Sequence, residues 1–206
     1  MNNQLLIVAN GKFPTCKIPI NILQKSKFII ACDGAANTLD DYGYKPNLII
    51  GDMDSISSAV KDKHKKRILN IKNQNQNDLR KAIEFCKINK LYNINIIGAT
   101  GEREDHTLGN IFSINNLDLN FNIKLFTDTG CFTAINKPTL IRSFPKQKIS
   151  LFSEYKHLKI TTYGLKYNLN NDSITTLFYG TLNESLGDSF FIEIKDNSIL
   201  LFLKYP

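Results

Sequence analysis

The spacing of its apolar segments limits the fold of this chain more than any other feature. Up to about residue 130, short strand-like apolar runs alternate with segments long enough to form helices. This alternation predicts a parallel sheet with helices packed on its faces. The carboxyl ends of such strands form one edge of the sheet, where ligands bind in proteins of this type. The predicted strands lie at residues 4–9, 27–31, 47–50, 94–97 and 122–126.

The pattern changes after Pro138. Short apolar runs then alternate with polar turns, which is typical of antiparallel β structure. We therefore predict an α/β chain, with an N-terminal parallel-sheet (Rossmann-like) domain at 1–135 and a smaller antiparallel β-sandwich domain at 136–206. The predicted runs of the second domain lie at 139–143, 148–152, 157–163, 174–180, 189–194 and 198–203.

Size and charge restrict the class of protein. A chain of 206 residues with 42% hydrophobic content can bury a core for one large or two small domains. Its net charge of +7 raises the question of nucleic-acid binding, and residues 61–67 form the most basic run. No aromatic residues interrupt this run and no nucleic-acid motif accompanies it, so a solvated helix face or loop is favoured. We expect no nucleic-acid partner.

Cysteine usage and the termini indicate the compartment. The cysteines at positions 16, 32, 86 and 131 show neither CxxC spacing nor close pairing, which favours reduced thiols in a cytoplasmic protein. The first ten residues lack the basic start and long apolar centre of a signal peptide. No apolar run approaches the roughly 20 residues that span a membrane. We expect a cytoplasmic protein with no membrane partner.

Two carboxylates stand two positions apart where a buried strand ends. The sequence GDMDS at residues 51–55 follows the apolar run at 48–50. If the backbone stays extended, the side chains of Asp52 and Asp54 leave the same side of the strand. Their oxygens can then share Mg²⁺, which keeps its other positions for water and substrate phosphates. The alternative is a solvated turn whose Asp side chains bond to their own backbone.

Two further segments place polar side chains at the ends of apolar runs. At residues 28–37, Asp33 and Asn37 stand among small residues that let a ligand approach, although Asp33 as a helix cap is the alternative. At residues 73–86, a polar loop leads into a helix whose apolar face comprises positions 79, 82, 83 and 86. Asp78 stands in its first turn, where an acid is often only a helix-start residue.

A strand, a glycine-containing loop and a helix start follow one another at residues 94–110. Backbone N–H groups at a helix N-terminus attract anions, and Arg103 can hold phosphate oxygens with two parallel hydrogen bonds. The segment matches neither the dinucleotide fingerprint nor the Walker A pattern. Asp105 as an N-cap and His106 as a structural residue are the alternative interpretations.

Taken in order, these segments resemble thiamine pyrophosphokinase. The similarity extends from about residue 31 to 186, most of the chain, and includes stretches like the family's GLKYPL and SNE near the C-terminus. The resemblance implies transfer of a pyrophosphoryl group from ATP to the hydroxyl of thiamine, giving thiamine diphosphate and AMP. The segments that carry it are residues 32–37, 51–55, 73–82, 98–110, 161–169 and 182–185.

The resemblance also implies roles for single residues. Asp52, Asp54 and Asp78 would bind Mg²⁺ and shape the phosphate site. Arg103 would neutralise the triphosphate, and Asp105 would complete the acidic cluster or orient Arg103. The implied catalytic residues are Asp52, Asp54, Asp78, Arg103 and Asp105; the nucleotide-binding residues are Asp33, Gly34, Asn37, Thr100 and Arg103; and the thiamine-binding residues are Gln74 and Asn183. An ordinary β-turn residue is the alternative for Asn183.

The family forms homodimers that hold thiamine between the α/β domain of one subunit and the β domain of the other, so we expect a homodimer that binds thiamine and ATP. The chain has no Trp, which leaves Phe or Tyr as the stacking partner of the thiazolium, with Phe178 and Tyr179 as candidates.

The chain departs from the family pattern in two loops. Where the family has Asp-Gln-Asp-x-Thr-Asp, residues 73–78 read NQNQND, so two acids have become amides and Thr has become Asn. Glu102 replaces a glycine near the expected phosphates. Two other classes therefore stay open: a metal-dependent phosphoesterase that activates water, and a nucleotide- or thiamine-binding module without catalysis.

Overall fold

The computed structural model describes residues 5–115, 117 and 120–206, and the chain divides into two compact units. The first unit comprises residues up to 113 together with 120–128, and the second comprises 114–119 together with 129–206. The predicted strand at 4–9 begins at Gln4, which lies outside the described residues. The predicted domain boundary at residue 135 stays a prediction. The same holds for the expected roles, which are catalysis and nucleotide binding for 1–135 and thiamine binding and dimerisation for 136–206.

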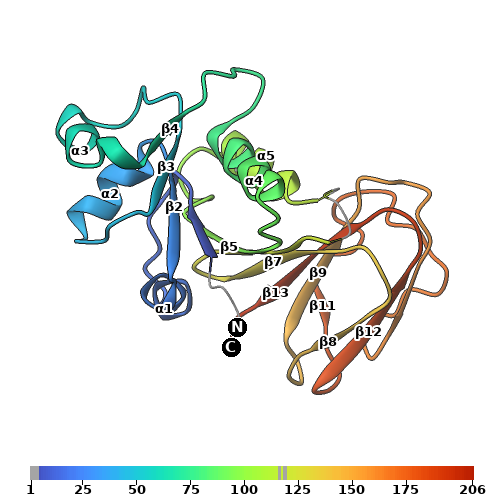
Figure 1. Ribbon diagram of the computed structural model, residues 1–206. Coiled ribbons are helices and arrows are strands. Elements are labelled where there is room, and N and C mark those ends of the chain that lie inside the picture. The colour runs from blue at the N-terminus through green and yellow to red at the C-terminus, as the bar shows by residue number, and fades with distance from the viewer. Residues whose placement is uncertain (1–4, 116, 118–119) are drawn as a thin grey trace. The chain divides into compact units, whose positions relative to one another are not determined.

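The first unit is built on a parallel sheet, as the apolar spacing predicts (Figure 1). Within the described residues its strands lie in the order β6-β5-β1-β2-β3-β4, and each pairs in parallel with its neighbours. Edge strand β4 was not predicted, because three residues without a fully buried side chain produce no pattern. The strands are β1 (Leu5–Val8), β2 (Phe28–Cys32), β3 (Leu48–Gly51), β4 (Ile68–Asn70), β5 (Asn93–Ile97) and β6 (Asn122–Phe126).

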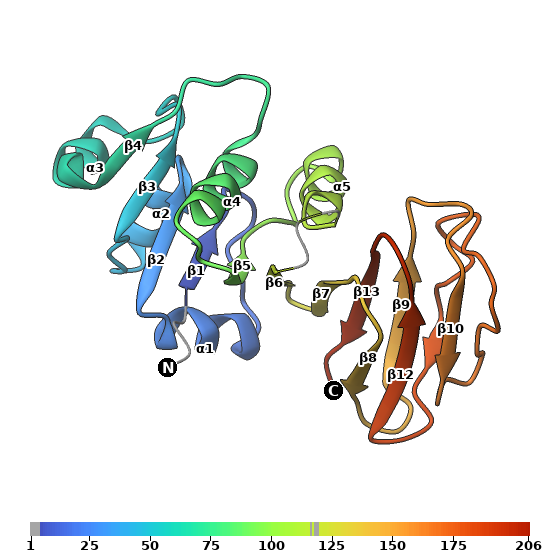
Figure 2. The same cartoon turned by 45° about the vertical axis from the view of Figure 1, so that its right-hand side comes forward.

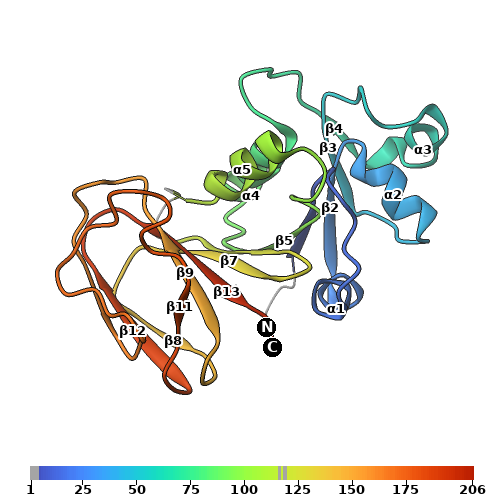
Figure 3. The ribbon, with the colours of Figure 1, turned by 180° about the vertical axis from the view of Figure 1, so that it is seen from behind.

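The α-helices of the first unit bury apolar side chains, except for the helix at Glu104–Ser113, which has no fully buried residue. The predicted face of α4, positions 79, 82, 83 and 86, is buried, which confirms the amphipathic pattern. Helix α2 packs on β2 and α4 packs on β2 and β3; the two helices lie on opposite sides of these strands (Figures 1 and 3). The helical segments are α1 (Lys17–Lys25), α2 (Ala35–Asp41), α3 (Ser58–Lys63), the 3₁₀ turn η1 (Lys65–Arg67), α4 (Asp78–Ile88) and α5 (Glu104–Ser113).

The strand order locates a ligand site. From β1 the chain adds β2, β3 and β4 on one side, whereas β5 and β6 lie on the other side of β1. The order therefore reverses between β1 and β5. Such a reversal point leaves a crevice for ligands in open parallel sheets.

The second unit is an antiparallel β-sandwich, as predicted (Figure 2). Strands β11, β9, β13 and β7 form one layer, and β10, β12 and β8 form the other. Ile149 and Leu201 from the first layer share one apolar core with Ile160 and Ile192 from the second. The strands are β7 (Gly130–Ile135), β8 (Thr139–Arg142), β9 (Lys148–Phe152), β10 (Ile160–Tyr163), β11 (Asn183–Glu184), β12 (Ser189–Ile194) and β13 (Ile199–Lys204).

One predicted strand of this unit, residues 174–180, is wrong. The segment forms turns instead, closed by backbone hydrogen bonds from Tyr179 N–H to Thr176 O and from Thr181 N–H to Phe178 O. Only Ile174 enters the core strongly, while Leu177 and Phe178 are exposed. An apolar run predicts burial, but here most of its apolar surface faces outward and gives no reason for a strand.

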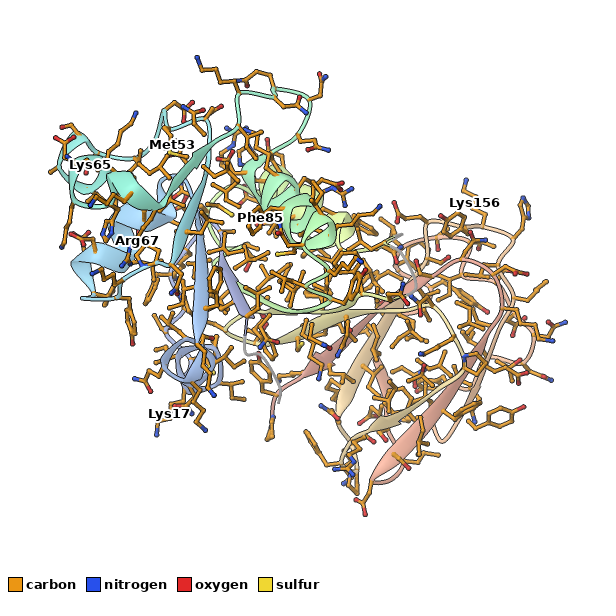
Figure 4. All side chains as sticks on the ribbon, viewed as in Figure 1. Lys17, Met53, Lys65, Arg67, Phe85 and Lys156 are labelled. Carbon is orange, nitrogen blue, oxygen red and sulfur yellow. The ribbon has the colours of Figure 1, made fainter. Side chains whose placement is uncertain are left out.

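The basic run at 61–67 forms the end of α3 and the turn η1. Figure 4 shows Lys65 and Arg67 on this segment, near edge strand β4. Lys63 pairs with Asp40, and the guanidinium of Arg67 donates to the carbonyl of Pro46. These contacts fit the interpretation of the run as a solvated helix face.

Two further findings concern membrane-spanning helices and the cysteines. No helix in the described part of the chain is long and apolar enough to cross a membrane. Among the described residues no disulfide joins any of the cysteines, and Cys32 and Cys86 are buried.

Candidate phosphate and metal site

A pocket of about 440 Å³ lies in the first unit where the strand order reverses. Its walls come from the loops after β1, β3 and β5, from the polar loop before α4, and from the first turns of α4 and α5. Most of the lining side chains are polar or charged, which suits a charged ligand better than an apolar one. Its lining residues include Asn10, Gly11, Asp52, Asp54, Gln74, Asn77, Asp78, Lys81, Thr100, Glu102, Arg103, His106 and Asn110.

Three carboxylates converge at this pocket. One oxygen from each of Asp33, Asp52 and Asp54 lies within 4.8 Å of the other two. The condition of an extended backbone between Asp52 and Asp54 is not met, because Met53 has a φ of +67° and turns the chain just beyond β3 (Figure 4). The left-handed turn brings the carboxylate of Asp54 back toward Asp33, which sequence spacing alone does not reveal.

Asp33 shapes this turn. Its Oδ2 accepts hydrogen bonds from the backbone N–H groups of Asp54 and Ser55, both at 3.1 Å, and its Oδ1 accepts one from Ile56 at 3.0 Å. The side chain is buried, with only 1% of the residue exposed. Burial raises the pKa of Asp33, and the backbone donor of Ser55 opposes this increase. Asp33 therefore acts on the pocket through the loop that it holds.

Asp54 has the opposite electrostatic environment. The hydroxyl of Ser55 donates to its Oδ1 at 2.8 Å, and this hydrogen bond lowers the pKa of Asp54. The side chain is exposed, so ionisation involves little desolvation. At neutral pH Asp54 is an available anionic ligand.

Gly51 allows the acidic groups to approach one another. A Cβ at this position would lie 2.7 Å from the Cβ of Asp33 and 3.1 Å from the carboxyl carbon of Asp78. Any side chain here would push two of the carboxylates apart. The glycine before the Asp52 position therefore has a packing function in the site.

The start of α4 brings the fourth carboxylate into the pocket. The Asn77 side chain caps the helix by accepting from the backbone N–H of Arg80 at 2.9 Å, and it also donates to Asn110 Oδ1 on α5 at 3.0 Å. Asp78 stands in the first turn and pairs with Lys81 at 2.8 Å. Gln74, from the loop before the cap, donates to Asp52 Oδ2 at 3.0 Å.

The glycine-containing loop after β5 is fixed against the loop after β1. The N–H of Gly11 donates to Gly98 O at 2.7 Å, and the N–H of Lys12 donates to Thr100 O at 3.0 Å. Gly98 and Gly101 both have positive φ angles, +67° and +91°, which favour glycine. Thr100 thus reaches the pocket from a loop with a defined backbone.

Arg103 and Asp105 form an exposed bidentate pair at the rim. The distances are 2.6 Å from Nη2 to Oδ2 and 3.1 Å from Nε to Oδ1. This pair lowers the pKa of Asp105 to about 2 and raises that of Arg103. Both side chains are more than half exposed, so the pair orients the guanidinium more than it stabilises the fold.

The pocket collects some of the predicted residues and omits others. Asp52, Asp54, Asp78, Gln74, Thr100 and Arg103 line it. Asp33, Gly34, Asn37 and Asp105 are not among its lining residues. Asn37 accepts from Ser57 N–H and donates to Ser55 O, so its amide holds the same loop that Asp33 holds.

Sequence reasoning did not assign a role to Lys81, Asn10 or Asn110, and it treated His106 as a structural residue. All four line the pocket. A signal existed for Lys81, which is three positions after Asp78 on the same helix and therefore on the same face. For Asn10 and Asn110 the spacing predicts nothing, because only the packed loops bring them to the pocket.

Asn183 lies in the second unit, where all its polar atoms are engaged. Its Oδ1 accepts from the backbone N–H of Tyr167 at 3.1 Å, and its Nδ2 donates to Tyr167 O at 2.7 Å. The residue is buried, so the side chain holds the segment around Tyr167 in place. Its predicted contact with thiamine stays a prediction.

Comparison with known proteins decides the family. The model described as "Thiamin pyrophosphokinase, catalytic domain" matches residues 20–127, and the one described as "Thiamin pyrophosphokinase, substrate-binding domain" matches residues 130–202. The chain belongs to the thiamin pyrophosphokinase family. It is therefore a transferase that makes thiamine diphosphate, in a family that uses ATP as the co-substrate.

Individual relatives agree with this family. The chain is 32% identical to thiamine pyrophosphokinase of Bacillus subtilis over 164 residues, which cover 71% of this chain and 72% of that protein. It is 30% identical to thiamin pyrophosphokinase 1 of Caenorhabditis elegans over 103 residues, which cover 46% of this chain and 42% of that protein. A crystal structure of the Bacillus subtilis thiamine pyrophosphokinase has the same fold, with a TM-score of 0.79, 22% identity and coverage of 97% of this chain and 98% of that chain.

Proposed function

We propose that this thiamin pyrophosphokinase carries out its transfer at the pocket of the first unit, with Asp52, Asp54 and Asp78 as the ligands of Mg²⁺. The observation that carries the proposal is the convergence of Asp33, Asp52 and Asp54 within 4.8 Å at the carboxyl edge of the sheet. Carboxylate oxygens at this spacing fit a hard cation that also binds substrate phosphates.

The acidic donor set fits Mg²⁺ because it offers only hard oxygen ligands. Asp54 is exposed and its pKa is lowered, so it is ionised and accessible to the cation. Asp33 is occupied by three backbone donors and keeps the Asp54 loop in place. When bound, Mg²⁺ neutralises charge on the transferred phosphates.

The opposite wall of the pocket would receive the nucleotide. Arg103 can release one of its two bonds to Asp105 and donate to phosphate oxygens in the same planar geometry. Thr100 offers a hydroxyl from the glycine-containing loop, close to the N-terminus of α5, where backbone N–H groups favour anions. Asp33 and Asn37 would contribute by holding the neighbouring loop. Gly34 would contribute by leaving room for the side chain of Asn10, which lines the pocket.

The reaction needs positioning more than acid–base chemistry. The thiamine hydroxyl oxygen forms a bond to the β-phosphorus of ATP, and the bond between that phosphorus and the bridging oxygen of the α-phosphate breaks, so AMP leaves. The hydroxyl proton passes to one of the pocket carboxylates. Asp52, Asp54 and Asp78 keep the reactants in line, and this alignment supplies most of the acceleration.

Thiamine recognition is assigned to Gln74, Asn183 and exposed aromatic residues. Gln74 reaches the pocket and already contacts Asp52. Phe178 is 76% exposed and Tyr179 is 53% exposed, so either face is available to a thiazolium ring. Asn183 contributes by fixing the backbone of Tyr167, which is also exposed.

We also propose that the protein is a homodimer in the cytoplasm. The second unit exposes several large apolar side chains close together in sequence, among them Phe178, Leu182 at 85% and Leu186 at 63%. Several large apolar side chains exposed close together favour a protein interface. The absence of disulfides among the described cysteines fits a reducing compartment.

The test is AMP formation from ATP and Mg²⁺ by the purified protein, with and without thiamine, together with chromatography for thiamine diphosphate. We expect thiamine-dependent AMP with an equal amount of the diphosphate. Phosphate release that is indifferent to thiamine would favour a phosphoesterase. Saturable binding without turnover would favour a binding module.

A further inference from the structure

Lys81 places an ammonium group inside the pocket, between two of the carboxylates assigned to the metal. Its Nζ lies 2.8 Å from Asp78 Oδ1 and 3.8 Å from Asp52 Oδ2. The side chain is 2% exposed, yet Lys81 lines the pocket. A buried ammonium group is tolerated only where carboxylates or other acceptors surround it.

The surrounding contacts make Lys81 part of a defined arrangement. Asp52 Oδ2 accepts a hydrogen bond from Gln74 and forms an ion pair with Lys81, so two side chains contact this oxygen. Lys81 stands one turn after Asp78 on α4, and the Asn77 cap fixes where that helix begins. The ammonium group is therefore attached to the same rigid element as one of its two partners.

Lys81 separates the acidic groups into two pairs. Asp52 and Asp78 are compensated by the lysine, whereas Asp33 and Asp54 are held by backbone donors and by the Ser55 hydroxyl. Without the lysine, Asp52 and Asp78 would lie in a partly buried pocket with no cationic partner among the described residues, and like charges at short range repel strongly there.

We propose that Lys81 is a positioning residue that serves as the internal cation of the phosphate site. It holds Asp52 and Asp78 in place when no metal is bound. Its charge lowers the affinity of the site for a free divalent cation and raises the affinity for the nucleoside triphosphate. The proposal rests on the metal and nucleotide roles proposed above for this pocket.

The sign of two effects separates this role from a purely structural one. A fixed positive charge opposes binding of a free cation and favours binding of a polyanion. Removing the charge therefore strengthens the first and weakens the second. A lysine that only helped to pack α4 would, when replaced, weaken both.

The test compares Lys81→Met, which keeps an unbranched side chain one atom shorter and removes its charge, with Lys81→Arg, which keeps the charge. Calorimetric titration with Mn²⁺, without nucleotide, should show about tenfold tighter binding to Lys81→Met than to the native protein. The KM for ATP at saturating Mg²⁺ should rise by about tenfold in the same variant. Lys81→Arg should stay close to the native protein in Mn²⁺ affinity.

Lys61→Met is the matched control. Lys61 is exposed on α3 and is not one of the pocket residues, so this variant removes the same net charge from the same unit. Both its Mn²⁺ affinity and its KM for ATP should equal the native values. A change as large as that of Lys81→Met would mean that overall charge, not the internal cation, controls binding.

Other outcomes are equally decisive. Mn²⁺ affinity of Lys81→Met that is unchanged or weaker would overturn the proposal, as would tighter binding in Lys81→Arg. If the native protein binds no Mn²⁺ without nucleotide, the metal role of the carboxylates fails, and the KM for ATP of Lys81→Met against Lys81→Arg alone decides the role of Lys81.

A variant that folds poorly is addressed by the double variant Asp78→Asn with Lys81→Met. Removing both partners leaves no uncompensated charge from that pair, so the double variant should regain part of the thermal stability that Lys81→Met loses in the presence of a chelator. If the double variant regains none of this thermal stability, the pair of Asp78 and Lys81 does not hold the metal-free site in place. That result would overturn the positioning role.

Discussion

The carboxylate of Asp33 accepts a hydrogen bond from the backbone N–H of Asp54, with 3.1 Å between Oδ2 and N. Two more backbone donors, from Ser55 and Ile56, complete the contact. The acid at the end of β2 therefore determines the path of the loop after β3, which carries a proposed metal ligand. Asp33 positions Asp54 through these hydrogen bonds, and its predicted contact with the nucleotide stays a prediction.

Asp33→Asn should lower stability and activity together. The amide keeps one acceptor oxygen but turns an NH₂ group toward the remaining backbone donors, which leaves a buried donor unsatisfied at a cost of about 1–3 kcal/mol. Asn tolerates the φ of +38° at this position, so the backbone itself adds little strain. Urea unfolding and initial rates measure the two effects.

The control for this change is Asp41→Asn, at an exposed position on α2. It should leave both the unfolding curve and the rate unchanged. A native-like unfolding midpoint for Asp33→Asn would show that the three hydrogen bonds do not hold the loop.

Asp54→Asn should reduce turnover far more than stability. The side chain is exposed, so the free energy of unfolding should change by less than about 0.5 kcal/mol. Loss of an anionic metal ligand should lower kcat by roughly 10- to 100-fold or more, with a higher Mg²⁺ concentration at half-maximal rate. A variant with a near-normal rate would remove Asp54 from the metal site.

Asn77→Ala should destabilise the protein by about 1 kcal/mol, because the side chain caps α4. Asn77→Thr, which introduces the residue usual in the family, should keep the cap but lose the hydrogen bond to Asn110. Thermal unfolding should rank native protein first, then Thr, then Ala. Equal midpoints for all three proteins would exclude the capping role.

Asn183→Ala should raise the KM for thiamine and lower the stability of the second unit. The substitution leaves the backbone N–H and C=O of Tyr167 without their partner, at a cost of about 1–3 kcal/mol. Steady-state kinetics below the unfolding temperature isolate the first effect. An unchanged KM for thiamine would show that the assignment of Asn183 to substrate binding is wrong.

Glu184 should make stability depend on pH in the acid range. Hydrogen bonds from Lys148 and then Lys166 lower its pKa to about 2 from an ordinary value of 4.5. A lowered folded-state pKa adds stability above 4.5, and this contribution is lost as the pH falls toward 2. The native protein and Glu184→Gln should therefore differ in unfolding midpoint near neutral pH and converge at about pH 2. Both lysines are largely exposed, so added salt should reduce the difference.

The fold could be predicted from sequence where the pattern is long and regular. The apolar face of α4 and most strands of both units follow from periodicity, because each element must bury one face or both. Periodicity missed β4, which is too short for a pattern, and also β7 and β11. It was wrong at residues 174–180, where exposed Leu177 and Phe178 imitate a buried strand.

The sequence predicted which residues line the candidate site better than it predicted how they are arranged. Asp52, Asp54, Asp78, Gln74, Thr100 and Arg103 all line the pocket. The turn at Met53 and the support of the Asp54 loop by Asp33 depend on contacts between segments far apart in sequence. Lys81 was missed because a lysine on a helix is usually solvated, and only packing shows that it is buried.

By itself, the sequence determined the parallel sheet, the sandwich that follows it, the family and the acidic residues at the strand ends, because these depend on local pattern and residue type. Only the tertiary structure decided that Asp33 supports the loop after β3 and that Asp54 is exposed to a ligand. It also decided that the ammonium group of Lys81 lies close to the neighbouring carboxylates. Burial and hydrogen bonding set the difference between the two acids, since the same kind of carboxylate is a buried acceptor at Asp33 and an exposed group with a lowered pKa at Asp54.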